Sequence, residues 1–298
     1  MVYDLTHCTL CPRKCGADRT KGKGFCGGGM LPRIAKAYLH MWEEPCICGD
    51  RGAGTVFFSG CSLGCVYCQN YKISAENHGA EISAERLADI FIELRDKGAA
   101  CIEAVSASHY VPQLIDALDI ARPKIDIPIV FNCGGYENTE TLRMLDGYID
   151  IYLPDLKYHS PEAAARYSSA PDYPMIAENA VKEMCRQTGG CVFDREYMKK
   201  GVIVRHLVLP KLYRDSIEIL KFLSSLPRDS FRLSLMSQYT PFYKSSEYPE
   251  IDRRIYTYEY ERVLEAAQEL GLEGYMQERS SAKEEYTPAF DLSGVFPE

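Results

Sequence analysis

The sequence has no long apolar run and no excess of basic residues. No stretch approaches the roughly 18 apolar residues of a membrane-spanning segment, and no apolar signal segment is found near the start of the chain. The formal net charge is −8, whereas a general nucleic-acid-binding protein carries a basic stripe. We therefore expect a cytoplasmic protein that enters no membrane and binds no nucleic acid.

Cysteine is well represented, but not at the density of a disulfide scaffold. The 298 residues include 13 cysteines, whereas small disulfide-stapled proteins contain more than about 8–10% cysteine. In a reducing cytosol, clustered cysteines indicate a metal site rather than disulfide bonds. The length fits one large domain with an appendage.

The most informative stretch is residues 54–73, GTVFFSGCSLGCVYCQNYKI. A run of residues that favour β-structure ends at a serine and a glycine, which predicts a strand followed by a loop. The loop carries a cysteine triad, which consists of Cys61, Cys65 and Cys68. Three thiolates at this spacing share one metal centre and leave one of four coordination positions open. Buried free thiols and a zinc site completed elsewhere are the alternatives, although zinc sites usually contain paired Cys-x2-Cys units.

Residues 1–53 are expected to form a separate module. It contains four closely spaced cysteines, which are Cys8, Cys11, Cys15 and Cys26. The glycines and the proline between them leave little room for regular structure. We therefore expect a metal site with four thiolates to stabilise the fold of this segment. Thiolate ligands suit both zinc and an iron–sulfur cluster, and the choice of metal stays open.

The N-terminal segment is opposite in charge to the whole chain. Residues 1–36 contain seven Lys or Arg residues against Asp4 and Asp18, which gives a local net charge of about +5. This basic patch is either a solvated surface or a docking face for an acidic electron donor.

Cys46 and Cys48 stand only one residue apart. If this segment is extended, their side chains point to opposite faces, so at most one of them faces a metal site. We expect neither to be an essential ligand. The preceding residues 43–45 form either a polar wall of the site or an exposed turn.

From residue 54 onward, strand-like and helix-like segments alternate. The predicted strands lie at 54–59, 100–106, 128–132, within 148–158, at 201–210 and at 231–238. The predicted helices lie at 83–97, 111–121, 138–147, 174–188, 215–226 and 257–270. Six such repeats predict an α/β fold with a parallel sheet, specifically a partial (β/α)6 TIM-like barrel over residues 54–275.

Polar residues follow each predicted strand. Besides the cysteine loop, the segments that follow strands are Ser106–Tyr110, Asn132–Tyr136, Asp155–Lys157 and Ser237–Tyr239, and Arg205–His206 lies within or near the end of the fifth strand. Because active residues of such barrels gather at the carboxyl ends of the strands, we expect a shared site on this rim.

Two further segments are less regular. The connection of about residues 156–200, between the fourth and fifth strands, is too long for a simple crossover. It either covers the barrel mouth, as a substrate lid or a partner-binding surface, or is a stable helical insertion with no role at the site. Residues 276–298 are expected to form an irregular C-terminal tail.

The cysteine triad resembles that of radical S-adenosylmethionine (SAM) enzymes. In that family three cysteines hold a [4Fe-4S] cluster, SAM chelates the fourth iron, and an aromatic residue, here Tyr67, precedes the third cysteine. The whole chain further resembles the activating enzymes of glycyl-radical proteins, most closely the pyruvate formate-lyase activating-enzyme-like (PflX-type) branch. The matching segments are CTLCPRKCG, EEP, GTVFFSGCSLGCVYCQN, HYVP, NCGGYE, DIYLPDLKY, VRHLVLP and LMSQY.

The resemblance implies three charged site residues, which are also the candidate catalytic residues. Asp155 and Lys157 match an Asp-x-Lys pair that helps to position SAM and substrate. Arg205 matches an arginine that approaches the carboxylate or ribose of SAM. Two of these side chains supply positive charge for a carboxylate.

The resemblance also implies neutral contacts to the cofactor. Asn132 matches an Asn-Gly-type turn, and Ser106 and Ser108 lie in the segment 103–109, which corresponds to the backbone contact with the SAM amino group. The usual Gly-Gly-Glu motif of that contact is absent. Activating enzymes often carry a histidine after the sixth strand, where this sequence has Ser237–Tyr239.

The implied activity is reductive cleavage of SAM to methionine and a 5′-deoxyadenosyl radical, which abstracts hydrogen from a substrate. The substrate is interpreted as the glycine of a glycyl-radical enzyme, or alternatively as another peptide or a small molecule. The expected partner is a one-electron donor of the flavodoxin or ferredoxin type. A third interpretation, of another class, is a non-catalytic metal-stapled binding or electron-carrier protein.

Overall fold

The computed structural model describes residues 3–276 and 288–297. The strands are β1 (Arg33–His40), β2 (Ala53–Phe58), β3 (Ala80–Glu81), β4 (Ile102–Val105), β5 (Ile129–Cys133), β6 (Ile151–Pro154), β7 (Val192–Asp194), β8 (Tyr197–Leu207), β9 (Arg232–Met236) and β10 (Gly274–Met276). The α-helices are α1 (Pro45–Cys48), α2 (Tyr71–Ser74), α3 (Ala84–Asp96), α4 (Val111–Ala121), α5 (Thr139–Met144), α6 (Pro161–Ser168), α7 (Tyr173–Thr188), α8 (Tyr213–Ser224) and α9 (Thr257–Glu269).

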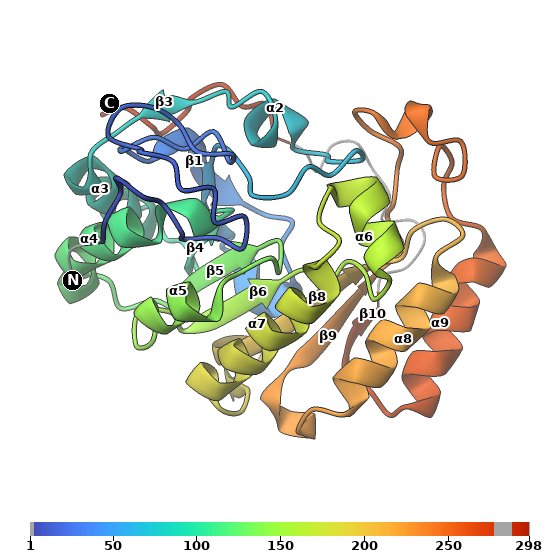
Figure 1. Ribbon diagram of the computed structural model, residues 1–298. Coiled ribbons are helices and arrows are strands. Elements are labelled where there is room, and N and C mark those ends of the chain that lie inside the picture. Colours follow the sequence, from blue (N-terminus) through green and yellow to red (C-terminus); the bar gives the residue numbers. More distant parts are fainter. Residues whose placement is uncertain (1–2, 277–287, 298) are drawn as a thin grey trace.

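The strands of the described residues form one curved sheet. Their order is β10-β9-β8-β6-β5-β4-β2-β1-β3, and β7 pairs with β8 outside this series. The strands from β10 to β2 in this order are parallel, whereas β1 is antiparallel to β2. Figure 1 shows α3, α4, α5, α7, α8 and α9 around the outside of the sheet. The predicted α/β fold with a parallel-rich, partial-barrel sheet is confirmed.

The sequence pattern accounts for these layers. Every residue of β2, β4, β5 and β6 is buried, as expected for parallel strands that are covered on both faces. The first long helix, α3, begins where the Ser83 hydroxyl accepts a hydrogen bond from the Arg86 N–H at 3.2 Å. All six predicted strands and all six predicted helices are present, with bounds that differ by four residues or fewer. No helix in the described ranges is both long and apolar enough to cross a membrane.

β1 lies within the segment 1–53 and belongs to the barrel sheet. Its backbone pairs with β2 over most of its length. Part of the predicted C-terminal tail extends along β1, since the Ala37 N–H donates to the Ser293 carbonyl at 2.9 Å and the Leu292 N–H donates to the Ala35 carbonyl at 3.1 Å. The rest of that tail, residues 277–287 and 298, lies outside the described residues.

The segment with Cys46 and Cys48 is helical, and the extended conformation considered for it is not found. Pro45 occupies the first turn of α1, where proline is favourable because its missing N–H has no helical partner. Both cysteines are buried in one apolar cluster with Cys101 and Met198, which stand at the beginnings of β4 and β8. α1 therefore closes the end of the barrel opposite to the carboxyl-end rim.

Candidate functional site

The loop with the cysteine triad begins where β2 ends. Gly60 has a φ of +92°, and a Cβ at this position would stand 2.2 Å from the carbonyl oxygen of Cys26. Both the backbone conformation and this close approach therefore require glycine. The next residue, Cys61, donates its N–H to the same carbonyl at 3.1 Å. The triad loop thus rests directly against the N-terminal cysteines.

Each sulfur of the triad has a hydrogen-bonding neighbour. The hydroxyl of Ser168 lies 2.9 Å from Cys65 Sγ, and the hydroxyl of Ser74 lies 3.2 Å from Cys68 Sγ. The backbone N–H two residues after Cys61 donates to the sulfur of Cys61 at 3.4 Å. Such donors stabilise thiolates, which is the state that binds metal.

Burial raises the pKa of all three triad thiols, and that of Cys65 rises to about 11. The positive charge of Lys157 acts in the opposite direction at each sulfur and favours the thiolate. In residues 3–276 and 288–297, no three His, Cys, Asp or Glu side chains converge on a point that would hold a single metal ion. The feature that fits an iron–sulfur cluster is the donor set, which is three adjacent thiols with hydrogen-bond donors and a lysine beside them.

Asp155, Lys157 and Arg205 form one ion-paired group next to the triad. Lys157 Nζ donates to Asp155 Oδ2 at 2.6 Å, and Arg205 Nε donates to Asp155 Oδ1 at 2.9 Å. Burial alone would raise the pKa of Asp155, but the positive charges of Arg205 and Lys157 outweigh burial and lower it. The Asp155 carboxylate is therefore ionised at neutral pH, and it fixes the direction of both cations.

The polar network continues into the barrel through Asn132. Arg205 Nη2 donates to Asn132 Oδ1 at 2.7 Å, and Asn132 Nδ2 donates to Glu103 Oε1 at 2.7 Å. Thr55 donates to the other Glu103 oxygen at 2.7 Å. Burial raises the pKa of Glu103 in spite of these hydrogen bonds. Glu43 lies 3.6 Å from Arg205, so the first residue of the EEP segment faces this network, whereas Pro45 is exposed.

Ser106 and Ser108 line a hollow of about 240 Å³ beside Cys61, together with Gly134 and Glu137. The Ser108 hydroxyl donates to Glu137 Oε1 at 2.8 Å. Burial raises the pKa of Glu137 from 4.5 to about 7, which is a large shift of the kind found at functional sites. Sequence reasoning missed Glu137, although the residue ends the NCGGYE segment.

Tyr67 lies behind the triad. Its hydroxyl is 2.6 Å from the hydroxyl of Tyr158, which is 2.8 Å from the hydroxyl of Ser168. Because Ser168 also reaches Cys65, a buried chain of hydroxyl groups leads from Tyr67 to a triad sulfur. Tyr158 and Ser168 belong to the connection 156–200, which thus supplies part of the wall around the triad.

The four N-terminal cysteines are gathered beside the triad loop. Cys8, Cys11 and Cys26 are buried, and Cys15 is exposed. A Cβ on Gly24 would lie 3.5 Å from the sulfurs of both Cys15 and Cys26, so these sulfurs border the same glycine. Burial raises the pKa of Cys11 to about 12. The set has the composition of a thiolate metal site.

Two arginines that sequence reasoning missed fix the N-terminal segment to the barrel. Arg19 is 1% exposed and donates to the carbonyls of His109 at 2.5 Å and Gly29 at 2.6 Å. Arg13 donates to the carbonyls of Ser62 at 2.8 Å and Ser169 at 2.6 Å. In the sequence both belong to a basic segment, and only the folded chain shows that their guanidinium groups point inward.

Two histidines near the rim have structural contacts. His109 Nε2 is 2.9 Å from the carbonyl oxygen of Ser59, and His206 Nδ1 is 2.6 Å from that of Leu156. Burial lowers the pKa of each histidine to about 4, so both are neutral at physiological pH. After β9, the Tyr239 hydroxyl donates to a backbone carbonyl at 2.8 Å.

Residues 55–223 match the family model described as Radical SAM superfamily. The chain belongs to this superfamily. Its members use a [4Fe-4S] cluster and SAM, which agrees with the triad and its surroundings. A relative in Methanocaldococcus jannaschii, the uncharacterized protein MJ0674, is 30% identical over 280 residues, which cover 90% of this chain and 76% of the relative.

A solved structure supports the fold. A radical SAM methyltransferase from Sphaerobacter thermophilus has a TM-score of 0.54 and 13% identity, and the match covers 77% of this chain and 67% of that chain. SuiB from Streptococcus suis, solved with bound SAM, has a TM-score of 0.48 and 14% identity, and the match covers 73% of this chain. This chain spans about half the length of SuiB, at 47%.

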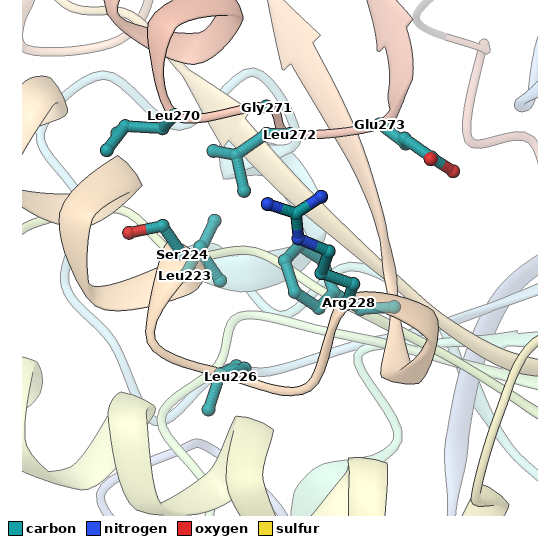
Figure 2. A pocket seen from close by; sticks show the side chains of 9 residues that line it. Leu223, Ser224, Leu226, Arg228, Leu270, Gly271, Leu272 and Glu273 are labelled. Carbon is teal, nitrogen blue, oxygen red and sulfur yellow. The ribbon is translucent and has the colours of Figure 1, made fainter.

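A second hollow, of about 420 Å³, lies far from this chemistry. Figure 2 shows that it is bordered by leucines at the end of α8, by the exposed Arg228, and by the segment Leu270–Glu273 after α9. Phe231 and Glu273 in its lining directly precede β9 and β10. The hollow is therefore at the amino ends of the strands, opposite to the rim that carries the cysteine triad.

Proposed function

We propose that this protein reductively cleaves SAM at a [4Fe-4S] cluster held by Cys61, Cys65 and Cys68 and abstracts hydrogen from a substrate. The observation that carries this proposal is the placement of the triad on the loop after β2, with the Lys157–Asp155–Arg205 group beside it on the same rim. The cluster supplies one electron, which breaks a carbon–sulfur bond of SAM to give methionine and a 5′-deoxyadenosyl radical.

The protein's own residues then bind and orient SAM. We assign Lys157 and Arg205 to its carboxylate or ribose, because the charge of Lys157 acts on all three triad sulfurs and Arg205 shares the Asp155 carboxylate with it. A carboxylate is bound well by such donors. Asp155 orients both cations. Asn132 holds the other side of the Arg205 guanidinium at 2.7 Å. Ser106, in the hollow beside Cys61, is assigned to the amino end of SAM.

Tyr67 and Ser108 have positioning roles in this proposal. Tyr67 supports the triad from behind through its hydroxyl chain to Ser168. Ser108 holds the buried Glu137 in the wall of the hollow. We further propose that residues 1–53 form a metal-binding module that also contributes β1 and α1 to the barrel. Residues 54–275 then form the rest of the barrel and 276–298 the tail, and the protein acts in the cytoplasm.

For the substrate, we propose the glycine of a glycyl-radical protein, in the manner of the PflX-type activating-enzyme-like branch. The support is the set of matching segments from CTLCPRKCG to LMSQY. A peptide or small-molecule substrate is the second candidate. It is favoured by the residues after β9, where Ser237 takes the place of the histidine often found in activating enzymes and its buried hydroxyl has no hydrogen-bond partner among residues 3–276 and 288–297.

The test is SAM cleavage by anaerobically prepared protein with dithionite, measured as 5′-deoxyadenosine by chromatography. Wild type should form the product, and Cys65→Ala should remain at background. Cys185→Ala is the matched control, because Cys185 is a buried thiol of α7 outside both cysteine sets. Product at background level in cluster-loaded wild type would contradict the proposal and favour a non-catalytic metal-stapled carrier.

The two substrate candidates are distinguished by EPR of a captured partner protein together with the same measurement of 5′-deoxyadenosine. A glycyl-radical partner, captured by this chain under anaerobic conditions, should acquire a protein-radical EPR signal when SAM and dithionite are added. If 5′-deoxyadenosine instead increases only with an added peptide or small molecule, and no protein radical forms, the second candidate holds.

A further inference from the structure

The N-terminal cysteines lie between the protein surface and the cysteine triad. On the inner side, the carbonyl of Cys26 accepts the N–H of Cys61 at 3.1 Å, so the two cysteine sets are in direct backbone contact. On the outer side, Cys15 is exposed. Gly24 borders the sulfurs of both Cys15 and Cys26. A redox centre held by this set would have one edge at the surface and the other against the triad.

Exposed basic residues flank Cys15 and Gly24 on this outer side. Lys14 is adjacent to Cys15 in sequence, and Lys23 is adjacent to Gly24, which contacts the Cys15 sulfur. Lys21 is also exposed, although its ammonium lies 3.1 Å from the carboxylate of Asp18. We call Lys14, Lys21 and Lys23 the basic rim. A large aromatic side chain, Phe25, is 57% exposed beside it.

The charge of this surface differs from that of the rest of the molecule. Residues 1–36 carry a net charge of +5, and because the whole chain carries −8, the remaining residues carry −13. Because Arg13 and Arg19 point inward, the positive charge that this segment exposes is mainly that of the basic rim. An acidic protein is therefore repelled by most of the chain and attracted to this segment, an effect that increases association rates by roughly 10- to 1,000-fold at low salt. An exposed aromatic group within a charged rim is also typical of protein contacts.

We propose that Cys8, Cys11, Cys15 and Cys26 hold a second iron–sulfur cluster that receives electrons from a small acidic one-electron carrier protein docked on the basic rim. This cluster passes each electron to the cluster at the triad. The inference rests on the proposed function, because the triad must hold a reducible cluster. It assigns the N-terminal segment as the route of electron entry.

The electron balance is simple. A carrier such as a flavodoxin in its hydroquinone form loses one electron and becomes the semiquinone. The N-terminal cluster gains that electron and then returns to its oxidised state as the triad cluster is reduced. No bond is formed or broken in these two steps, and each SAM cleaved consumes one electron from the carrier.

The first experiment compares two reductants with one charge-reversal variant. The variant is Lys14→Glu, Lys21→Glu, Lys23→Glu. The control, Arg195→Glu, Lys199→Glu, Lys200→Glu, changes the charge equally on exposed residues near the amino end of β8. SAM cleavage is measured with reduced flavodoxin and, separately, with dithionite, which needs no docking surface.

With flavodoxin, the rim variant should cleave SAM at least about tenfold more slowly than wild type at low salt, whereas the control should match wild type. With dithionite, all three proteins should be equal. Equal rates of rim variant and wild type with flavodoxin would overturn the inference. Failure of wild type with dithionite would overturn the proposed function itself.

The second experiment tests the metal. Cys15→Ser removes the exposed ligand and leaves the buried thiols in place. By EPR, reduced wild type should show two clusters whose spins interact, because Cys26 and Cys61 are in direct contact. The variant should lose one cluster and its flavodoxin-driven activity, and should keep the triad signal with dithionite. One zinc per chain in wild type, with four irons, would contradict a second cluster.

Discussion

The hydroxyl of Ser168 lies 2.9 Å from the sulfur of Cys65, although 103 residues separate the two in sequence. Ser168 is the last residue of α6, and its side chain is fully buried. The long connection after β6 therefore reaches the triad and supplies a hydrogen-bond donor to one of its ligands. Hydrogen bonds to ligand sulfurs are among the factors that set the potential of an iron–sulfur cluster.

Replacing Ser168 by alanine should lower the reduction potential of the triad cluster, because the bond favours the more negative, reduced state. The loss of about 1 kcal/mol corresponds to roughly 40 mV for one electron. An EPR-monitored redox titration measures this value. Ser169→Ala is the control, since this neighbouring side chain makes no bond to a triad sulfur. Equal potentials in Ser168→Ala and wild type would contradict the assigned role.

Gly60 and Gly98 offer a matched pair, because both have a φ of +92°. The Cβ of an alanine at Gly98 meets no atom of the described residues within 4 Å, so this substitution should cost only about 1 kcal/mol of backbone strain. Alanine at Gly60 places a Cβ 2.2 Å from the Cys26 carbonyl oxygen. We expect Gly60→Ala to separate the two cysteine sets and to reduce iron content after anaerobic reconstitution, while Gly98→Ala binds iron as wild type does. Normal iron content in Gly60→Ala would show that the close contact is unnecessary.

Arg205→Lys should weaken SAM binding about tenfold, which corresponds to about 1.4 kcal/mol. A lysine keeps the charge but cannot bind Asp155 and Asn132 at the same time as the planar guanidinium does. Anaerobic calorimetry measures the dissociation constant. Arg232→Lys serves as control, because Arg232 pairs with the exposed Glu273 at the other end of the barrel. An unchanged dissociation constant in Arg205→Lys would remove Arg205 from the SAM site.

Glu137 should make the protein less stable as the pH rises. Its pKa in the folded chain, about 7, is above the ordinary 4.5. The part of the free energy of unfolding that comes from this bound proton is therefore fully present below pH 4.5. It is lost as the pH rises from 4.5 through about 7, with a total change of about 3 kcal/mol. Urea unfolding of wild type and Glu137→Gln should show that the variant gains relative stability between pH 5 and pH 8. A constant difference across this range would contradict a buried, protonated Glu137.

The barrel could be predicted because the residues that determine each strand and helix lie close together in the sequence. Periodic apolar residues, helix caps such as Ser83 and the glycines after strands fix each element within a few residues. The cysteine triad was visible for the same reason, since its ligands lie close together in sequence. The rim residues followed from the rule that parallel strands end on one side.

The features that escaped prediction depend on distant contacts. Arg13 binds the carbonyl of Ser169, 156 positions away, and no local pattern distinguishes it from the exposed Lys14 beside it. α1 is helical because it is buried against the starts of β4 and β8, which a short Cys-x-Cys segment does not reveal. Glu137 gained its raised pKa only through burial by the folded chain.

The central claim is that the triad holds a cluster with an open position for SAM. The most direct test is the iron and acid-labile sulfide content, with EPR of the reduced protein with and without SAM, for wild type and the Cys61→Ala, Cys65→Ala, Cys68→Ala triple variant. About eight irons in wild type, about four in the variant, and a spectral change with SAM only in wild type are expected. A fully loaded wild type whose spectrum does not respond to SAM would contradict the account.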